Sequence, residues 1–158
     1  MFVNQLRIKL SKLILEMTSN KDYIDYPLAD IAAKFQELAK FREKLGLPVA
    51  GSENDGSTVA KLEIGDREFF GVNSGSDPNP RRVVTLRVNP ISKTHAEADV
   101  MQQAFDAGIR GGRARLIVDR DLCRPCGQNG GVKGMAKQLD LEELEVISPS
   151  GCDVIRLK

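Results

Sequence analysis

The sequence predicts a single α/β domain with a mixed central sheet of about five strands and helices on its faces. Two patterns predict this fold: an early pair of strand-like segments joined by a two-residue turn, and a later alternation of helix and strand patterns. At 158 residues, with 41% hydrophobic and 28% charged side chains, the chain has the size and composition of one compact domain.

An amphipathic helix is expected near the N-terminus, because apolar residues recur there at helical spacing: Leu6, Leu10, Leu13, Ile14 and Met17. A polar break follows, so residues 1–22 are assigned to an N-terminal helix or linker extension and residues 23–158 to the domain. No window approaches the ~20 consecutive apolar residues of a membrane-spanning helix. We therefore expect a soluble chain without membrane contact.

The first helix of the domain is expected to follow Pro27, which suits a first helical turn, and to end at Gly46 and Pro48. Its apolar stripe consists of Leu28, Ile31, Ala32, Phe35, Leu38 and Leu45. This helix should cover one face of the sheet.

A β-hairpin is expected next. Residues 60–64 and 67–73 alternate apolar and polar side chains on either side of Gly65-Asp66, where glycine at the first central position fits a type II′ turn. Residues 74–80 are too rich in turn formers to be regular. Residues 81–88 alternate again and predict either a short strand or an extended cover.

Beyond Pro90 the pattern changes to helix over 94–107, strand over 114–118, helix over 123–139 and strand over 144–147. This alternation is typical of βαβ units. The last two strands should therefore pair in parallel.

The residues able to carry chemistry lie where these two late helices are expected to begin. They form the sequences His95-Ala96-Glu97 and Cys123-Arg124-Pro125-Cys126. Unpaired amides at a helix N-terminus favour thiolates, which are the form of cysteine that binds metal. One imidazole and two thiolates form a zinc ligand set that leaves the fourth position for water, as in a catalytic site. Glu97 can reach that position and act as general base, then acid.

Each motif has an alternative interpretation. Thr94 and Glu97 match a capping box, which would only satisfy helix amides. The Cys-x-x-Cys pair alone is compatible with a redox dithiol or with half of a structural zinc site, for which Cys152 would have to fold back. Cys152 otherwise reads as a small buried hydrophobe. Three cysteines in a domain of this size favour a reducing compartment.

Basic residues concentrate in the second half of the chain. The formal net charge is +1, yet residues 79–137 contain eleven Lys or Arg against five Asp or Glu. Such an excess suits a polyanionic substrate, and it is also what an ordinary solvated face carries.

The signature His-x-Glu followed by Cys-x-x-Cys, with this order of elements, resembles the zinc-dependent cytidine deaminase-like superfamily from about Pro27 to Lys158. Within it, Phe70-Gly71-Val72-Asn73-Ser74, His95-Ala96-Glu97-Ala98 and the late Cys-x-x-Cys look most like deaminase domains of bacterial polymorphic toxins. Some members of that group deaminate cytosine in single-stranded DNA, and such domains normally end a longer secreted protein. The resemblance implies a three-layer fold and a hydrolase acting on the carbon–nitrogen bond of a cyclic amidine.

Carried onto this sequence, the resemblance implies Zn²⁺ held by His95, Cys123 and Cys126, with Glu97 as the proton shuttle. Leu122 stands where the family commonly has proline before the first cysteine. This departure weakens the assignment of subfamily and substrate more than it weakens the assignment of the metal ligands.

The expected substrate contacts begin with Asn73, which matches an asparagine that contacts the nucleotide in many members and is equally an ordinary turn residue. Ala96 is the second expected substrate contact. The expected contacts to the nucleic-acid backbone are Arg81, Arg82, Lys93 and Arg124.

The function expected from this resemblance is conversion of cytosine to uracil in single-stranded DNA by a bacterial toxin domain. Such a toxin would be secreted, would act in the cytoplasm of the target cell and would have a cognate immunity protein. Only 5% of the residues are aromatic and none is Trp, so no base-stacking platform is evident. Double-stranded DNA, RNA, adenine and free nucleosides remain alternative substrates. A non-catalytic zinc or thiol module is the alternative from a different class.

Overall fold

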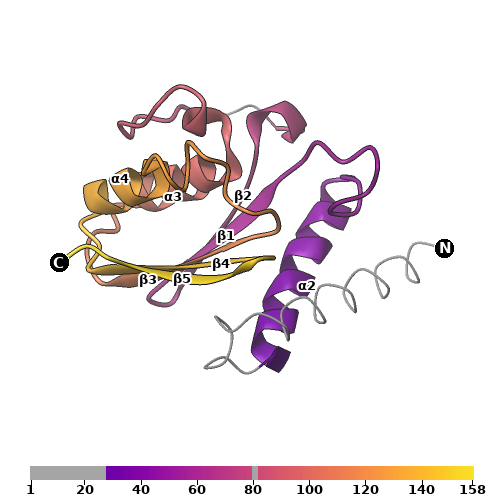
Figure 1. The fold of residues 1–158 in the computed structure, drawn as a ribbon. Coiled ribbons are helices and arrows are strands. Elements are labelled where there is room, and N and C mark those ends of the chain that lie inside the picture. Colours follow the sequence, from indigo (N-terminus) through magenta and orange to yellow (C-terminus); the bar gives the residue numbers. More distant parts are fainter. Residues whose placement is uncertain (1–27, 80–81) are drawn as a thin grey trace.

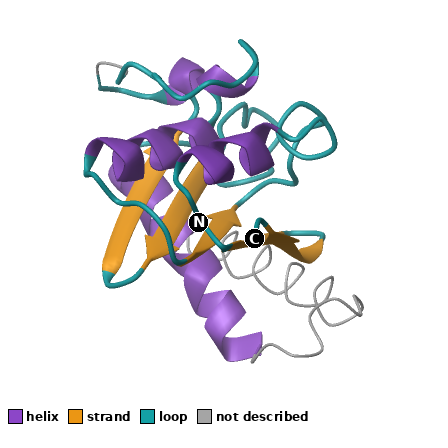
Figure 2. Ribbon diagram, turned by 90° about the vertical axis from the view of Figure 1, so that its left-hand side faces the viewer, coloured by secondary structure: helices purple, strands orange, loops and turns teal. Residues whose placement is uncertain are grey.

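The computed structural model describes residues 28–79 and 82–158 and has three layers (Figure 1). A five-stranded sheet with the order β2-β1-β3-β4-β5 lies between α2 on one face and α3 with α4 on the other (Figures 1 and 2). In chain order the elements are α2 (Leu28–Lys44), β1 (Val59–Ile64), β2 (Arg67–Val72), the 3₁₀ helices η2 (Ser74–Ser76) and η3 (Ser92–Thr94), α3 (Ala96–Asp106), β3 (Arg113–Val118), α4 (Gly131–Gln138), β4 (Glu143–Ser148) and β5 (Gly151–Arg156).

The sheet has the predicted hairpin and the predicted parallel pair. Strands β1 and β2 pair antiparallel with Ile64 opposite Arg67, so Gly65 and Asp66 form a two-residue turn. Gly65 has a φ of +58°, a conformation that glycine adopts without steric cost. Strand β3 pairs antiparallel with β1 and parallel with β4, which confirms the βαβ unit around α4.

The fifth strand differs from the prediction. It is β5, an edge strand that pairs antiparallel with β4, and residues 82–88 form no strand. All six residues of β5 are half-buried or exposed, so the apolar alternation that marks a strand is weak there.

Residues 82–88 instead form the extended cover that the sequence allowed. The amides of Thr85 and Leu86 both donate to the side-chain oxygen of Gln102 on α3, at 2.8 and 3.0 Å. The side chain of Leu86, which belongs to this segment, is buried in the core. The backbone therefore finds its partners on a helix side chain rather than on a neighbouring strand.

The core lies on both faces of the sheet. Leu62, Leu116 and Val146 face α3 and α4, whereas the opposite face packs against α2 with a second set: Ile31, Phe35, Leu38, Val59, Val72, Ile117 and Ile147. Helix α2 therefore covers one sheet face, as predicted. Its bounds, Leu28–Lys44, also agree with the prediction.

The predicted helix in residues 5–17, the boundary at residue 22 and Arg81 lie outside the described residues. Within the described residues, no helix combines the length and the apolar character that crossing a membrane requires.

Candidate active site

His95 is fixed by the junction between η3 and α3. It is the N-cap residue of α3, with φ −88° and ψ 159°, and its amide donates to the carbonyl of Ser92 at 3.1 Å. Its carbonyl accepts the amide of Asp99 as the first helical hydrogen bond. The predicted helix thus begins at Ala96 rather than at Thr94.

The capping box does not form. The Thr94 hydroxyl donates to the carbonyl of Ile91 at 2.8 Å, and the N-cap residue makes no side-chain capping bond. The carboxylate of Glu97 is therefore available for another function.

The two cysteines lie in a turn between β3 and α4. The prediction that they begin a helix is wrong, because α4 starts only at Gly131, five residues beyond Cys126. The turn closes on itself when the amide of Gly127 bonds the carbonyl of Cys123 at 2.9 Å, and Gly130 in the left-handed region ends it. Thiolate stabilisation by a helix N-terminus therefore does not apply, and the charge of a bound metal has to supply it.

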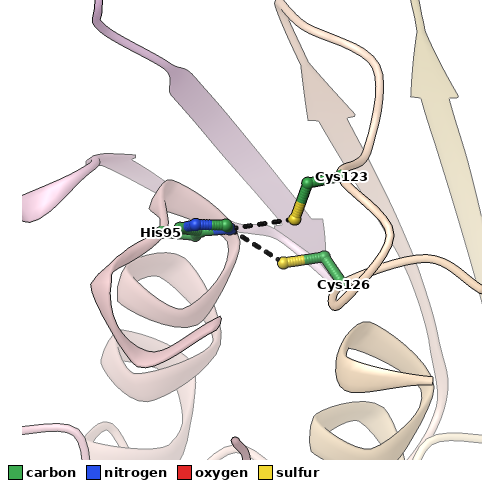
Figure 3. A group of neighbouring side chains, drawn as sticks. All are labelled: His95, Cys123 and Cys126. Atoms are coloured by element: carbon green, nitrogen blue, oxygen red, sulfur yellow. Dashed lines mark hydrogen bonds between the residues drawn. The ribbon is translucent and has the colours of Figure 1, made fainter. Parts of the chain in front are cut away.

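The structure brings the three predicted ligands together, although 28 residues separate His95 from Cys123 (Figure 3). His95 Nδ1 lies 3.0 Å from Cys126 Sγ and 3.3 Å from Cys123 Sγ. All three ligand atoms lie within 4.8 Å of one another. Zn–N bonds of ~2.0 Å and Zn–S bonds of ~2.3 Å would place nitrogen and sulfur about 3.6 Å apart. The donor set and spacing fit one zinc ion after movements of a few tenths of an ångström.

Glu97 lies beside this cluster with its carboxylate buried. The residue is 3% exposed, and its Oε2 atom has no hydrogen-bond partner among the residues that the structure describes. Burial raises the pKa of Glu97, against the opposing effects of its own amide, of His95 and of the Cys126 thiol. A buried acceptor without a partner costs about 1–3 kcal/mol, so this oxygen marks a place where a polar ligand is expected. A water held by a metal at the cluster would fit.

Burial also raises the pKa of Cys126, and the neighbouring Glu97 carboxylate adds to this effect. The metal-free cluster therefore holds a protonated thiol at neutral pH. Because metal ligation requires the thiolate, binding of zinc must release that proton.

The amide of Asn73 acts within the loop that follows β2. Its Oδ1 accepts the amide of Thr58 at 2.9 Å, and its Nδ2 donates to the carbonyl of Gly56 at 3.4 Å. These contacts match the turn-residue alternative. Ala96 is fully buried at the start of α3, directly after His95.

The basic candidates differ in their surroundings. Arg82 bonds the buried carboxylate of Asp99 at 2.6 Å and so anchors its own segment to α3. Lys93 and Arg124 are exposed, one on η3 and one inside the cysteine turn. Positive charge therefore lies close to His95 on one segment and to Cys123 and Cys126 on the other.

Sequence reasoning did not single out Ser92, which is fully buried with its hydroxyl 3.4 Å from Cys126 Sγ. The spacing of Asn89 and Ser92 is a local turn signal. Their proximity to Cys126 is not visible in the sequence, because 34 residues intervene.

A separate cleft of about 370 Å³ opens at the other end of the sheet, lined by Arg113, Glu142, Glu143, Arg156 and Lys158. It lies where β3 and β4 begin, whereas the cysteine turn follows the end of β3. The lining contains neither histidine nor cysteine, so this cleft does not compete as the metal site.

A family model described as MafB19-like deaminase matches residues 35–153, from α2 into β5. Comparison with curated proteins and with solved structures yields no match. The matched range contains strands β1 to β4 and the start of β5, the histidine–cysteine cluster and Glu97, and covers well over half of the chain. With its mixed α/β sheet and this cluster, the chain belongs to the MafB19-like deaminases, a cytidine deaminase-like group associated with polymorphic toxins.

Proposed function

We propose that this chain is a zinc-dependent hydrolase that converts cytosine to uracil in single-stranded DNA, as the toxic domain of a secreted bacterial protein. Membership of the family supports deaminase activity. The observation that carries the proposal further is the buried, unpartnered Oε2 atom of Glu97 beside the cluster of His95, Cys123 and Cys126.

His95, Cys123 and Cys126 would hold the zinc ion. When bound, zinc supplies a water whose pKa is lowered far below that of bulk water, towards about 7. Three protein ligands are the number that a catalytic zinc site uses, with one position left for that water.

Glu97 would move the protons. Its carboxylate accepts a proton from the attacking water and delivers it to the ring nitrogen as oxygen bonds to C4. A second transfer through Glu97 would carry the proton of the hydroxyl added at C4 to the amine, so that the carbonyl forms as the carbon–nitrogen bond breaks and uracil and ammonia leave. Its buried position suits this function, because the raised pKa helps the carboxyl to hold a proton between the two transfers.

Charge around the site favours a polyanionic substrate. Lys93 lies two residues before His95, and Arg124 directly follows Cys123, so both cations flank ligands at the surface. A single strand is preferred because the target base must leave its stack before it reaches the zinc. A cognate immunity protein that covers this surface would protect the producing cell.

The test is a panel of single-stranded DNA, double-stranded DNA, RNA, and free cytidine and adenosine, each incubated with zinc-loaded protein. Base conversion is read by sequencing or mass spectrometry, and ammonia is measured in parallel. The proposal expects cytosine-to-uracil conversion to be fastest in single-stranded DNA and absent with Glu97→Gln.

Faster conversion of another polymer would identify that polymer as the substrate and would leave the proposed chemistry unchanged. Bound zinc without ammonia release from any substrate would identify a non-catalytic zinc module instead. Loss of turnover at high salt would support a polymer substrate, because a neutral nucleoside carries no phosphates to be screened.

A further inference from the structure

The buried hydroxyl of Ser92 contacts one sulfur of the cluster. Ser92 is fully buried on η3, and its Oγ atom lies 3.4 Å from Cys126 Sγ. In the metal-free protein the thiol donates to this oxygen. A thiolate has no proton to give, so the contact survives metal binding only if the hydroxyl donates instead.

Asn89 leaves the hydroxyl proton of Ser92 available for that purpose. Asn89 Oδ1 accepts the amide of Ser92 at 2.8 Å, and this bond identifies the other amide atom as Nδ2. Asn89 Nδ2 then donates to Ser92 Oγ at 3.0 Å. The oxygen therefore accepts from the asparagine, and its own proton is free to point elsewhere. Among the described residues, Cys126 is the other side chain in hydrogen-bond contact with this hydroxyl.

Close packing holds the hydroxyl in place. A Cβ atom at Gly131 would lie 2.9 Å from Ser92 Oγ and 2.7 Å from the carbonyl of Pro125. The absence of a side chain at the first residue of α4 therefore lets the cysteine turn and η3 approach each other. The Ser92 oxygen therefore has little room to move away from Cys126, and only the direction of its proton can change.

We propose that Asn89 and Ser92 are positioning residues for the metal: Asn89 orients the Ser92 hydroxyl, which donates to the Cys126 thiolate and fixes it as a ligand. This inference rests on the proposed zinc site. Hydrogen bonds that orient the ligands of a metal typically change its affinity about 10–100-fold.

The test measures zinc affinity by competition with a chromophoric chelator, for the wild type, Ser92→Ala and Asn89→Asp. Ser92→Ala removes the donor and should weaken zinc binding about 10–100-fold. Asn89→Asp keeps the acceptor for the Ser92 amide and nearly the same shape, but its second oxygen accepts hydrogen bonds. The Ser92 hydroxyl should then turn towards Asp, and zinc binding should weaken as in Ser92→Ala.

The double variant Asn89→Asp/Ser92→Ala separates orientation from the added charge. In the Ser92→Ala background there is no hydroxyl to reorient, so Asn89→Asp can act there only through its charge. We expect the double variant to bind zinc no more weakly than Ser92→Ala alone. Ser52→Ala is the matched control, because its hydroxyl bonds the loop carbonyl of Val49 at 2.7 Å in a loop that carries none of the ligands. It should bind zinc as the wild type does.

Cobalt-substituted protein gives a readout that a purely structural function would not move. A hydrogen bond stabilises the sulfur lone pair, so its loss should shift the sulfur-to-cobalt charge-transfer band to lower energy. We expect this shift in Ser92→Ala and Asn89→Asp and not in Ser52→Ala. If Ser92→Ala fails to fold, Asn89→Asp still decides, because it keeps the turn.

Wild-type affinity and spectrum in both folded variants would overturn the inference and leave the proposed function standing. A wild-type protein that binds neither zinc nor cobalt would overturn both. Weakened binding in Asn89→Asp that persists at equal size in the Ser92→Ala background would assign the effect to charge and also overturn the inference.

Discussion

The guanidinium of Arg42 bonds the carboxylate of Asp119 through both Nε and Nη2, across 77 residues of chain. It also bonds Asp55 at 2.9 Å and the backbone carbonyls of Pro48 and Ser57. The last turn of α2 is thereby fixed to the end of β3, from which the chain continues to the cysteine turn. This buried charge cluster therefore holds the backbone from which the cysteine turn begins.

Replacing Arg42 with Met should destabilise the protein by about 3–5 kcal/mol, because it leaves two buried carboxylates without their cation. Urea unfolding measures the change. Arg156→Ala is the matched control, since its pair with Glu143 is long and exposed, and we expect a change within about 0.5 kcal/mol. Equal effects of the two substitutions would contradict a special contribution of Arg42.

The same cluster makes the free energy of unfolding depend on pH in the acidic range. Burial would raise the pKa of Asp55, but hydrogen bonds from Arg42 and from the amides of Gly51 and Ser57 outweigh it, so the pKa lies below its ordinary value. A lowered folded-state pKa stabilises the protein above the ordinary carboxyl pKa, and this stabilisation is lost as pH falls through the folded value. Asp55→Asn should therefore flatten the fall in unfolding free energy between about pH 5 and pH 2. An unchanged slope would show that Asp55 is not the group responsible.

Glu97→Gln should abolish deamination while zinc remains bound. Loss of a general acid and base lowers rates about 10²–10⁴-fold, whereas the ligand set stays intact. Cys126→Ser should instead lose most of the zinc, as measured by elemental analysis of the purified protein. Residual turnover of Glu97→Gln near the wild-type rate would refute the proton-transfer function.

Removal of metal should expose one thiol and leave the other two unreactive. Chelation frees the half-buried Cys123 for alkylation, whereas Cys126 is buried with a raised pKa, and burial and Glu145 raise the pKa of Cys152 to about 12. Mass spectrometry of the alkylated protein at pH 7.5 should show one modified cysteine after chelation and none before. Equal labelling of all three cysteines in both states would argue against a metal cluster.

Salt should weaken substrate binding, and part of that dependence should come from Lys93 and Arg124. Each phosphate contact contributes about one unit to the slope of log affinity against log salt, so Lys93→Ala or Arg124→Ala should reduce the slope by roughly 0.7–1. Lys44→Ala, on the far side of the sheet at the end of α2, is the control and should leave the slope unchanged. The measurement is a fluorescence titration with labelled single-stranded DNA at several salt concentrations.

Local sequence patterns determined the parts of this fold that depend on backbone preference. Gly65-Asp66 defined the hairpin, and Gly46 with Pro48 defined the end of α2, because glycine adopts a positive φ without steric cost and proline fixes φ wherever it stands. The donor set was likewise available from the sequence, since its members form two short motifs and His95 is the sole histidine.

Tertiary packing decided the rest. Residues 82–88 alternate as a strand does, but Gln102 takes their amides, and the cysteines that were expected to begin a helix lie in a turn closed by glycines. The contacts of Arg42 with Asp119 and of Ser92 with Cys126 join segments that are 77 and 34 residues apart. Periodicity and turn signals describe neighbours along the chain, whereas such contacts exist only after the helices have packed on the sheet. The sequence thus determined which atoms can bind the metal, and the folded structure determined where they meet and what orients them.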